Sequence, residues 1–171
     1  MGLFDALTGT KKPKSGTPVK PLAEVRAGLL ALNRDTAPWH IREATPEEKC
    51  DLVVEWRIVD AKWYEIFAKA GLKSVFKIFL KFDDAKKEVR AVDQEWTVEW
   101  RAGIPSLSLS AEAFRGQKAE ISFGTAYAFT EQGGYGQVYN YAFKTAEMKT
   151  PIQDVITGSG WTYRAVSFGK L

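Results

Sequence analysis

Alternating apolar and polar residues between Ser74 and Gly103 predict the longest hairpin of the chain. Side chains that are two residues apart share one face of a strand. In residues 75–82 the apolar positions on one face are Phe76, Ile78, Leu80 and Phe82, and in residues 96–101 they are Trp96, Val98 and Trp100. The charged residues 83–87 between the two halves suit a solvated turn. The three polar residues 93–95 are expected to interrupt the second strand.

The two-residue period of strands and the 3.6-residue period of helices predict the other elements. Further strands are expected at residues 39–42, 51–59, 106–110 and 161–168, and helices at residues 22–33, 61–72 and 150–158. A second hairpin is expected from residues 119–130 and 136–144, joined by a Glu-Gln-Gly-Gly turn. Together these elements predict an α+β domain: a strongly curved or barrel-like antiparallel sheet of hairpins, of roughly six to eight strands, with two or three packed helices.

The length and the local composition predict one domain preceded by a tether. A chain of 171 residues can bury one good core, which is expected from residues 22–171. Residues 11–21 contain three prolines and four lysines, which is typical of an extended, hydrated linker. We therefore expect residues 1–21 to be an amphipathic start and a basic, flexible tether.

The first residues also suggest a membrane contact. Leu3, Phe4 and Leu7 have helical spacing, and the basic residues Lys11, Lys12 and Lys14 follow them. A short amphipathic segment next to basic residues is drawn to anionic lipid, although seven residues bury little apolar area and give weak association. The alternative is a terminus that packs on its own domain or makes no contact.

Charge and cysteine content narrow the function classes. The formal net charge is +3, from 24 basic and 21 acidic residues, and this near balance disfavours a nucleic-acid binder. Cys50 is the single cysteine, so an intramolecular disulfide is excluded. No apolar run approaches the roughly 20 residues that span a bilayer, and the start does not resemble a secretory signal. A cytoplasmic location is expected.

Aromatic residues make up 13% of the chain, with six Trp, six Tyr and ten Phe. Rings of this size need a core, a sheet face or a binding surface to cover them. Core packing is the first interpretation, and a groove for an apolar ligand or a peptide is the second. The residues predicted to line such a groove are Tyr127, Phe129, Tyr139, Tyr141, Trp161 and Tyr163. The same surface would suit a protein partner or self-association.

Reactive chemistry has few candidates in the sequence. His40 is the single histidine and Cys50 lies ten residues further on, but neither is in a known catalytic motif. Asp93 and Glu95 could form a paired-carboxylate site or could simply be solvated. One Cys and one His disfavour a zinc site, and no glycine motif has the context of a phosphate loop. We therefore assign no catalytic residue, metal or cofactor.

Three functional hypotheses follow. The first is a non-enzymatic binding or interaction domain for an apolar or amphipathic ligand or for a protein partner. The second is a membrane-peripheral protein attached through residues 1–20. The third is a small carboxylate-dependent hydrolase that uses the acidic residues near the central hairpin, with His40 as a further participant.

Overall fold

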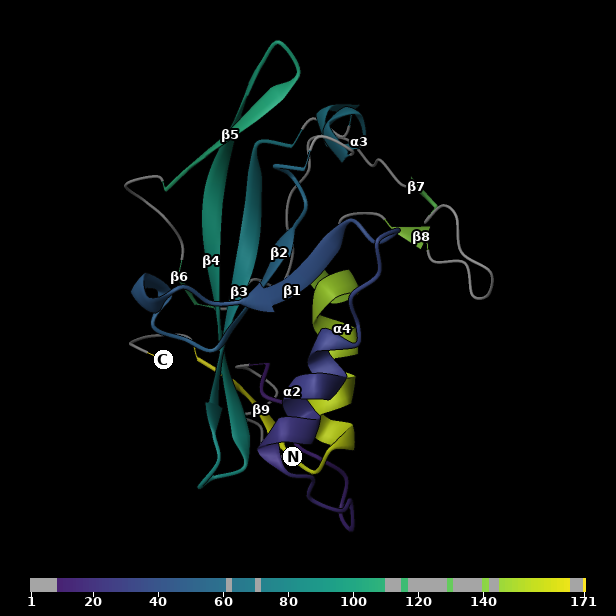
Figure 1. Cartoon of the computed structure of the whole chain (residues 1–171), viewed down its shortest axis with the longest axis vertical. Helices are drawn as coiled ribbons and strands as arrows, with labels where there is room; N and C mark the ends of the chain where they lie inside the picture. Colours follow the sequence, from purple (N-terminus) through teal and green to yellow (C-terminus); the bar gives the residue numbers. More distant parts are fainter. Residues whose placement is uncertain are drawn as a thin grey trace.

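Strand β4 (Glu88–Arg101) is the axis of the sheet, because other strands pair with both of its edges. Strand β3 (Ser74–Asp83) is its antiparallel partner on one edge. The other edge pairs in succession with β9 (Thr162–Ala165), β6 (Arg115–Gly116) and β5 (Ile104–Ser108). Figure 1 shows β3 and β4 as the long vertical pair, and the upper end of β4 projects together with β5 beyond the other strands. The predicted central hairpin is confirmed.

The computed structural model describes residues 9–60, 63–69, 72–109, 115–116, 129–130, 140–141, 145–166 and 171. Strands β1 (Trp39–Glu43) and β2 (Leu52–Trp56) extend the sheet beyond β3, which gives seven strands in the order β1-β2-β3-β4-β5 with β6 and β9 also on β4. Within these residues no pairing joins β1 to β5. The sheet is open, and the expected barrel-like closure is not confirmed.

The sheet is mixed, whereas the sequence predicted an antiparallel one. Strand β9 runs parallel to β4, and the other pairs are antiparallel. Helix α4 (Thr145–Gly158) precedes β9 and packs beside the sheet, so it acts as the crossover that a parallel strand requires. Alternation within β9 could not reveal this direction.

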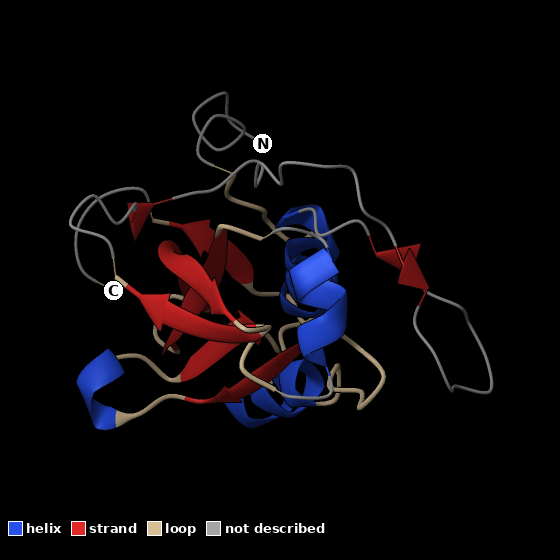
Figure 2. Cartoon of the chain, turned by 90° about the horizontal axis from the view of Figure 1, so that it is seen from above, coloured by secondary structure: helices blue, strands red, loops and turns tan. Residues whose placement is uncertain are grey.

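Two helices cover one face of the sheet. Helix α2 (Leu22–Leu30) lies beside α4, and Figure 2 shows both on the same side of the strands. They approach closely at Gly28, where an added Cβ would lie 3.1 Å from Cγ1 of Val155. The third helix, α3 (Tyr64–Lys69), lies beyond one end of the sheet, and the 3-10 turn η1 (Pro46–Glu48) joins β1 to β2. The prediction of an α+β fold is confirmed.

The main core lies between this face and the two helices. Its buried residues from the helices are Val25, Leu29, Met148, Ile152 and Ile156, and those from the strands include Ile41, Val54, Phe76, Ile78 and Leu80. The opposite face, here called the outer face, carries a smaller apolar cluster of Val53, Phe79, Val92 and Val166. Burial of one face by period-two alternation is as predicted.

Three local expectations were wrong. Residues 93–95 do not interrupt a strand, because Asp93 and its neighbours continue the ladder with β3. Pro151 does not begin a helix but lies inside α4, which starts at Thr145. The helix predicted to reach residue 33 ends at Leu30, and the Asn33 side chain bonds to β1.

Most of the second predicted hairpin lies outside the described residues. The part that is described is a two-stranded pair of β7 (Phe129–Thr130) and β8 (Asn140–Tyr141), with Phe129 opposite Tyr141. Among the helices that the structure describes, none combines the length and apolar character needed to cross a membrane.

Candidate functional site

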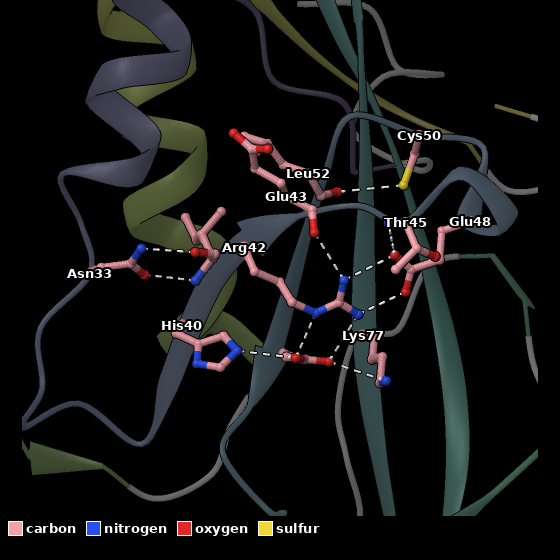
Figure 3. Close-up of polar contacts among 11 residues, drawn as sticks. Asn33, His40, Arg42, Glu43, Thr45, Glu48, Cys50, Leu52 and Lys77 are labelled. Carbon is pink, nitrogen blue, oxygen red and sulfur yellow. Dashed lines mark hydrogen bonds and ion pairs between the residues drawn. The ribbon is translucent and has the colours of Figure 1, made fainter. Parts of the chain in front are cut away.

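A polar row on the outer face crosses three strands. His40 of β1, Glu55 of β2 and Lys77 of β3 occupy facing positions in the strand register. The Glu55 carboxylate lies 3.0 Å from Nε2 of His40 and 3.1 Å from Nζ of Lys77. Figure 3 shows the His40 and Lys77 side chains approaching from opposite sides, with Arg42 above them. The lysine also lies 4.6 Å above the Trp96 ring, which adds a cation–π contact.

Arg42 joins this row to the turn that follows β1. Its Nε donates to Glu55 at 2.8 Å, and its two terminal nitrogens donate to Glu48 at 2.9 and 2.7 Å. Glu48 also accepts from the backbone N–H of Thr45, which is one half of a capping box at the start of η1. The guanidinium therefore ties the sheet to the η1 turn through two carboxylates, and we call these residues with His40 and Lys77 the Glu55 cluster.

The charges of the Glu55 cluster neutralise one another. Burial raises the pKa of Glu55, but hydrogen bonds from His40 and Arg42 and the charge of Lys77 lower it well below its usual value. The hydrogen bond from Arg42 likewise lowers the pKa of Glu48. Both carboxylates are ionised at neutral pH, so neither can serve as a general acid. The arrangement is suited to fixing the turn on the sheet.

Of the residues considered for hydrolysis, Asp93 and Glu95 share one face of β4, but His40 is not beside them. His40 is on the outer face, whereas Asp93 is opposite Ile78 on the face that the helices cover. Cys50 donates to the carbonyl of Leu52 at 3.6 Å, and burial raises the pKa of its thiol to about 11. Such a thiol is protonated at neutral pH and is a poor nucleophile. In the described part of the chain, no group of three metal-ligating side chains is found.

A buried ion pair connects α4 to the sheet. Asp93 is fully buried, and its Oδ2 lies 2.5 Å from Nζ of Lys149, which is 12% exposed. Tyr163 is also fully buried, and its hydroxyl has no hydrogen-bond partner among the described residues. Burial first, and then the Asp93 charge, raise the pKa of this phenol well above its usual value. These groups are shielded from solvent and serve packing.

The segment interpreted as a tether makes definite contacts along its described part. Lys11 exchanges two backbone hydrogen bonds with Tyr163, of 2.9 and 2.8 Å. Thr10 is buried, and its hydroxyl accepts from the N–H of Ala165. Further along, the carbonyl of Lys20 accepts from the Trp161 indole at 2.8 Å. Residues 10–20 are thus attached at both ends to the region around β9.

Between these attachments the segment forms a hollow against α4. The lining residues are Lys11, Lys12, Lys14, Thr17, Thr150, Gln153, Asp154, Thr157 and Gly158, and the volume is about 570 Å³. A turn from Lys14 to Thr17 shapes the wall, since the N–H of Thr17 donates to the carbonyl of Lys14 and Gly16 between them has φ of +84°. We call this the lysine hollow. Three lysines face one aspartate in it.

The predicted site residues are thereby placed as follows. The side chains of Trp161 and Tyr163 are fully buried in the main core. Phe129 and Tyr141 are paired in β7 and β8, whereas Tyr127 and Tyr139 lie outside the described residues. The described rings do not gather into one aromatic cluster; the pairs found are Trp56 with Phe67 and Phe82 with Trp161. A ligand-binding role for the six rings stays a prediction.

Of the residues predicted to contact a membrane, only the lysines are described. Leu3, Phe4 and Leu7 lie outside the described residues, and the three lysines that follow them are exposed in the lysine hollow. Sequence reasoning found these lysines as a basic run, but it could not find their partners on α4. It also missed the Glu55 cluster, because the alternation of β2 marks Glu55 only as a polar position and says nothing of its cross-strand neighbours.

Comparison with known proteins gives no further guide to the site: no family model, curated protein or solved structure matches this chain.

Proposed function

We propose that the protein is a non-enzymatic binding domain and that the lysine hollow is its ligand site, specific for an anionic group. The observation that carries the proposal is the excess of positive charge. Three ammonium groups and one carboxylate give the lining a net charge of +2. A volume of about 570 Å³ is within the usual range for small-molecule sites, about 300–1,000 Å³.

The contacts of the lysines support this proposal. Within the described residues, the ammonium groups of Lys11 and Lys14 lie within 4.0 Å of no carboxylate, whereas Lys77 is paired with Glu55. The backbone of Lys11 is held by β9, so its side chain projects from a fixed base. An anion in the hollow would meet the ammonium groups of Lys11 and Lys14, and its binding would weaken with added salt.

The anion could be a free solute or the headgroup of a lipid. Both present the same phosphate chemistry, and the lipid source corresponds to a membrane-peripheral protein. What favours this second function is that the three lysines are exposed and close in sequence to the apolar Leu3, Phe4 and Leu7. A cytoplasmic location and a protein partner are further proposals that rest on the composition.

The test is calorimetric titration of the full chain with inorganic pyrophosphate at low salt. We expect binding that the Lys11→Ala/Lys14→Ala variant weakens at least about tenfold, because two of the three cations are lost. The matched control, Lys73→Ala/Lys86→Ala, removes the same charge from positions that do not line the hollow and should stay within about twofold. Equal weakening by both variants, or no binding by the wild type, would overturn the proposal.

Sedimentation with vesicles separates the two sources of the anion. A lipid-directed protein pellets with phosphatidylserine vesicles but not with phosphatidylcholine vesicles, and the Lys11→Ala/Lys14→Ala variant stays in solution. A protein that binds a free solute titrates with pyrophosphate and stays in solution with both vesicles. Native mass spectrometry of the same sample reports any co-purified ligand or self-association.

A further inference from the structure

The lysine hollow contains hydrogen-bond acceptors as well as cations. Its wall on α4 consists of residues 150, 153, 154, 157 and 158, which recur at the spacing of one helix face. Four of these side chains carry oxygens that accept hydrogen bonds: Thr150, Gln153, Asp154 and Thr157. The other wall, shown in Figure 1 as the loop beside the lower end of α4, carries Lys11, Lys12 and Lys14. The two walls therefore differ in chemistry.

Two threonine hydroxyls of the hollow, those of Thr17 and Thr157, already donate hydrogen bonds within the protein and can only accept from a ligand. Thr17 Oγ1 donates to the carbonyl of Lys14 at 2.7 Å, and Thr157 Oγ1 donates to the carbonyl of Gln153 at 2.8 Å. A hydroxyl has one hydrogen to donate and two lone pairs to accept with. Because both hydrogens are already used, each hydroxyl offers acceptors. A ligand that satisfies them must carry O–H or N–H donors.

The lysines require hydrogen-bond acceptors on the ligand, since an ammonium group has three donors and no acceptor. Among the residues that the structure describes, the lining includes no aromatic or large aliphatic side chain that could stack on a nucleobase or hold an acyl chain. A fitting ligand combines an anionic end with a hydroxyl-rich body. A volume of about 570 Å³ leaves room for such a body beside the anionic group.

We propose that the ligand is a phosphorylated polyol, that is, a sugar phosphate or an inositol phosphate. Its phosphate lies against the lysine wall, and its hydroxyls donate to Asp154 and to the threonine oxygens. This inference rests on the proposed function and deepens it. Asp154 distinguishes a polyol phosphate site from a simple anion site, because a carboxylate repels a bare phosphate but accepts from a neighbouring hydroxyl.

The experiment compares three probes by calorimetry on the full chain: inorganic phosphate, phenyl phosphate and glucose 6-phosphate. We expect glucose 6-phosphate to bind at least about fivefold more tightly than phenyl phosphate, which has the anion without the hydroxyls. Asp154→Ala should weaken glucose 6-phosphate while leaving inorganic phosphate unchanged or tighter. The matched control, Glu24→Ala, removes an exposed carboxylate of α2 that does not line the hollow and should alter neither affinity.

Each outcome has a distinct meaning. Equal affinity for phenyl phosphate and glucose 6-phosphate, or an Asp154→Ala variant that weakens all three probes alike, would overturn the polyol inference and leave the anion site standing. Failure of every probe, pyrophosphate included, would overturn the proposed function itself. If the inference holds, vesicles containing phosphatidylinositol phosphate or phosphatidic acid show whether the polyol is a lipid headgroup: retention only by the former identifies one, and retention by neither identifies a free solute.

Discussion

The side-chain amide of Asn33 pairs with both backbone groups of Ile41. Its Nδ2 donates to the Ile41 carbonyl at 2.8 Å, and its Oδ1 accepts from the Ile41 N–H at 2.7 Å. Strand β1 is the last in the sheet order, so these groups would otherwise face outward from its edge. The amide thus acts as one peptide unit of a missing neighbour strand, and protects the edge from pairing with another chain.

Asn33→Ala should therefore destabilise the protein and expose the β1 edge. Loss of two hydrogen bonds that leave backbone groups without partners costs about 1–3 kcal/mol. Asn33→Asp should not rescue the loss, because a carboxylate cannot donate to the Ile41 carbonyl. Urea unfolding gives the energy, and hydrogen exchange of the Ile41 N–H gives the location. Unchanged exchange in both variants would contradict the assigned role.

Acid should unfold the protein partly through Glu55. Because its pKa is lowered in the folded state, the unfolded chain binds more protons below the ordinary glutamate pKa of about 4.3. Its contribution is present above that pH and is lost as the pH falls. Glu55→Gln should cost about 2–3 kcal/mol at pH 7. The cost should shrink as the pH falls below about 4.3, because the stability that the lowered pKa of Glu55 contributes is lost there. Urea unfolding at several pH values measures this, with Glu24→Gln as the exposed control; parallel curves for wild type and Glu55→Gln would refute it.

Removing one partner of the buried ion pair between Asp93 and Lys149 should destabilise the protein more than removing both. Asp93→Ala removes the carboxylate 2.5 Å from the Lys149 ammonium, and such a change costs about 3–5 kcal/mol. The double variant Asp93→Ala/Lys149→Met removes both charges and should recover part of that loss. Glu99→Ala, which breaks an exposed contact of 3.8 Å with Arg101, should have little effect. Thermal unfolding of the four proteins decides this; a double variant that is no more stable than Asp93→Ala would count against the pair.

The N-terminal segment can pack in place only because residue 160 is a glycine. A Cβ at this position would lie 2.6 Å from the carbonyl oxygen of Pro18, and the residue also has φ of +75°. Gly103 is a matched control, since its φ is +77° and an added Cβ meets nothing within 4 Å. Gly103→Ala should cost about 1 kcal/mol from backbone strain, and Gly160→Ala clearly more. Hydrogen exchange at Lys11 should accelerate only in Gly160→Ala; the same response in both variants would show that the contact with Pro18 does not matter.

Cys50 should react slowly with alkylating reagents at neutral pH. Burial raises the pKa of its thiol to about 11, so the thiolate is a minor form at pH 7. The alkylation rate of the folded protein should rise with pH up to about 11, while the urea-unfolded protein should show the ordinary thiol pKa of about 8.5. Mass spectrometry follows both reactions. A folded-state midpoint near 8.5 would show that the thiol is more accessible than its surroundings indicate.

Local alternation was enough to predict the strands but not their partners. The apolar face of β3, which includes Ile78, could be read directly, because burial on one side imposes a period of two. Nothing local could show that β9 lies beside β4 and parallel to it, since that pairing depends on where α4 returns the chain. The polar residue Asp93 misled for a related reason: its partner Lys149 lies on a distant helix, so it looked like a break in the strand.

Only the lysine side of the candidate site could be predicted from the sequence. Lys11, Lys12 and Lys14 were visible as a basic run, because neighbouring charges are evident in any sequence. The acceptors of α4, such as Asp154, became relevant only when the backbone of Lys11 was found beside Tyr163. A site formed by segments about 140 residues apart in the chain leaves no local pattern, which is the general difficulty with long-range contacts.

The placement of β9 has a consequence for biosynthesis. Strand β4 pairs with β9, which begins more than 60 residues after β4 ends, and Lys11 then pairs with β9 from the N-terminal side of the chain. Until a ribosome has added residues 161–165, the edge of β4 that β9 covers is bare and the carbonyl of Lys20 lacks the Trp161 indole as its donor. Assembly of the lysine hollow must wait for translation of this strand, so nascent chains that stop before it should be the ones that chaperones retain.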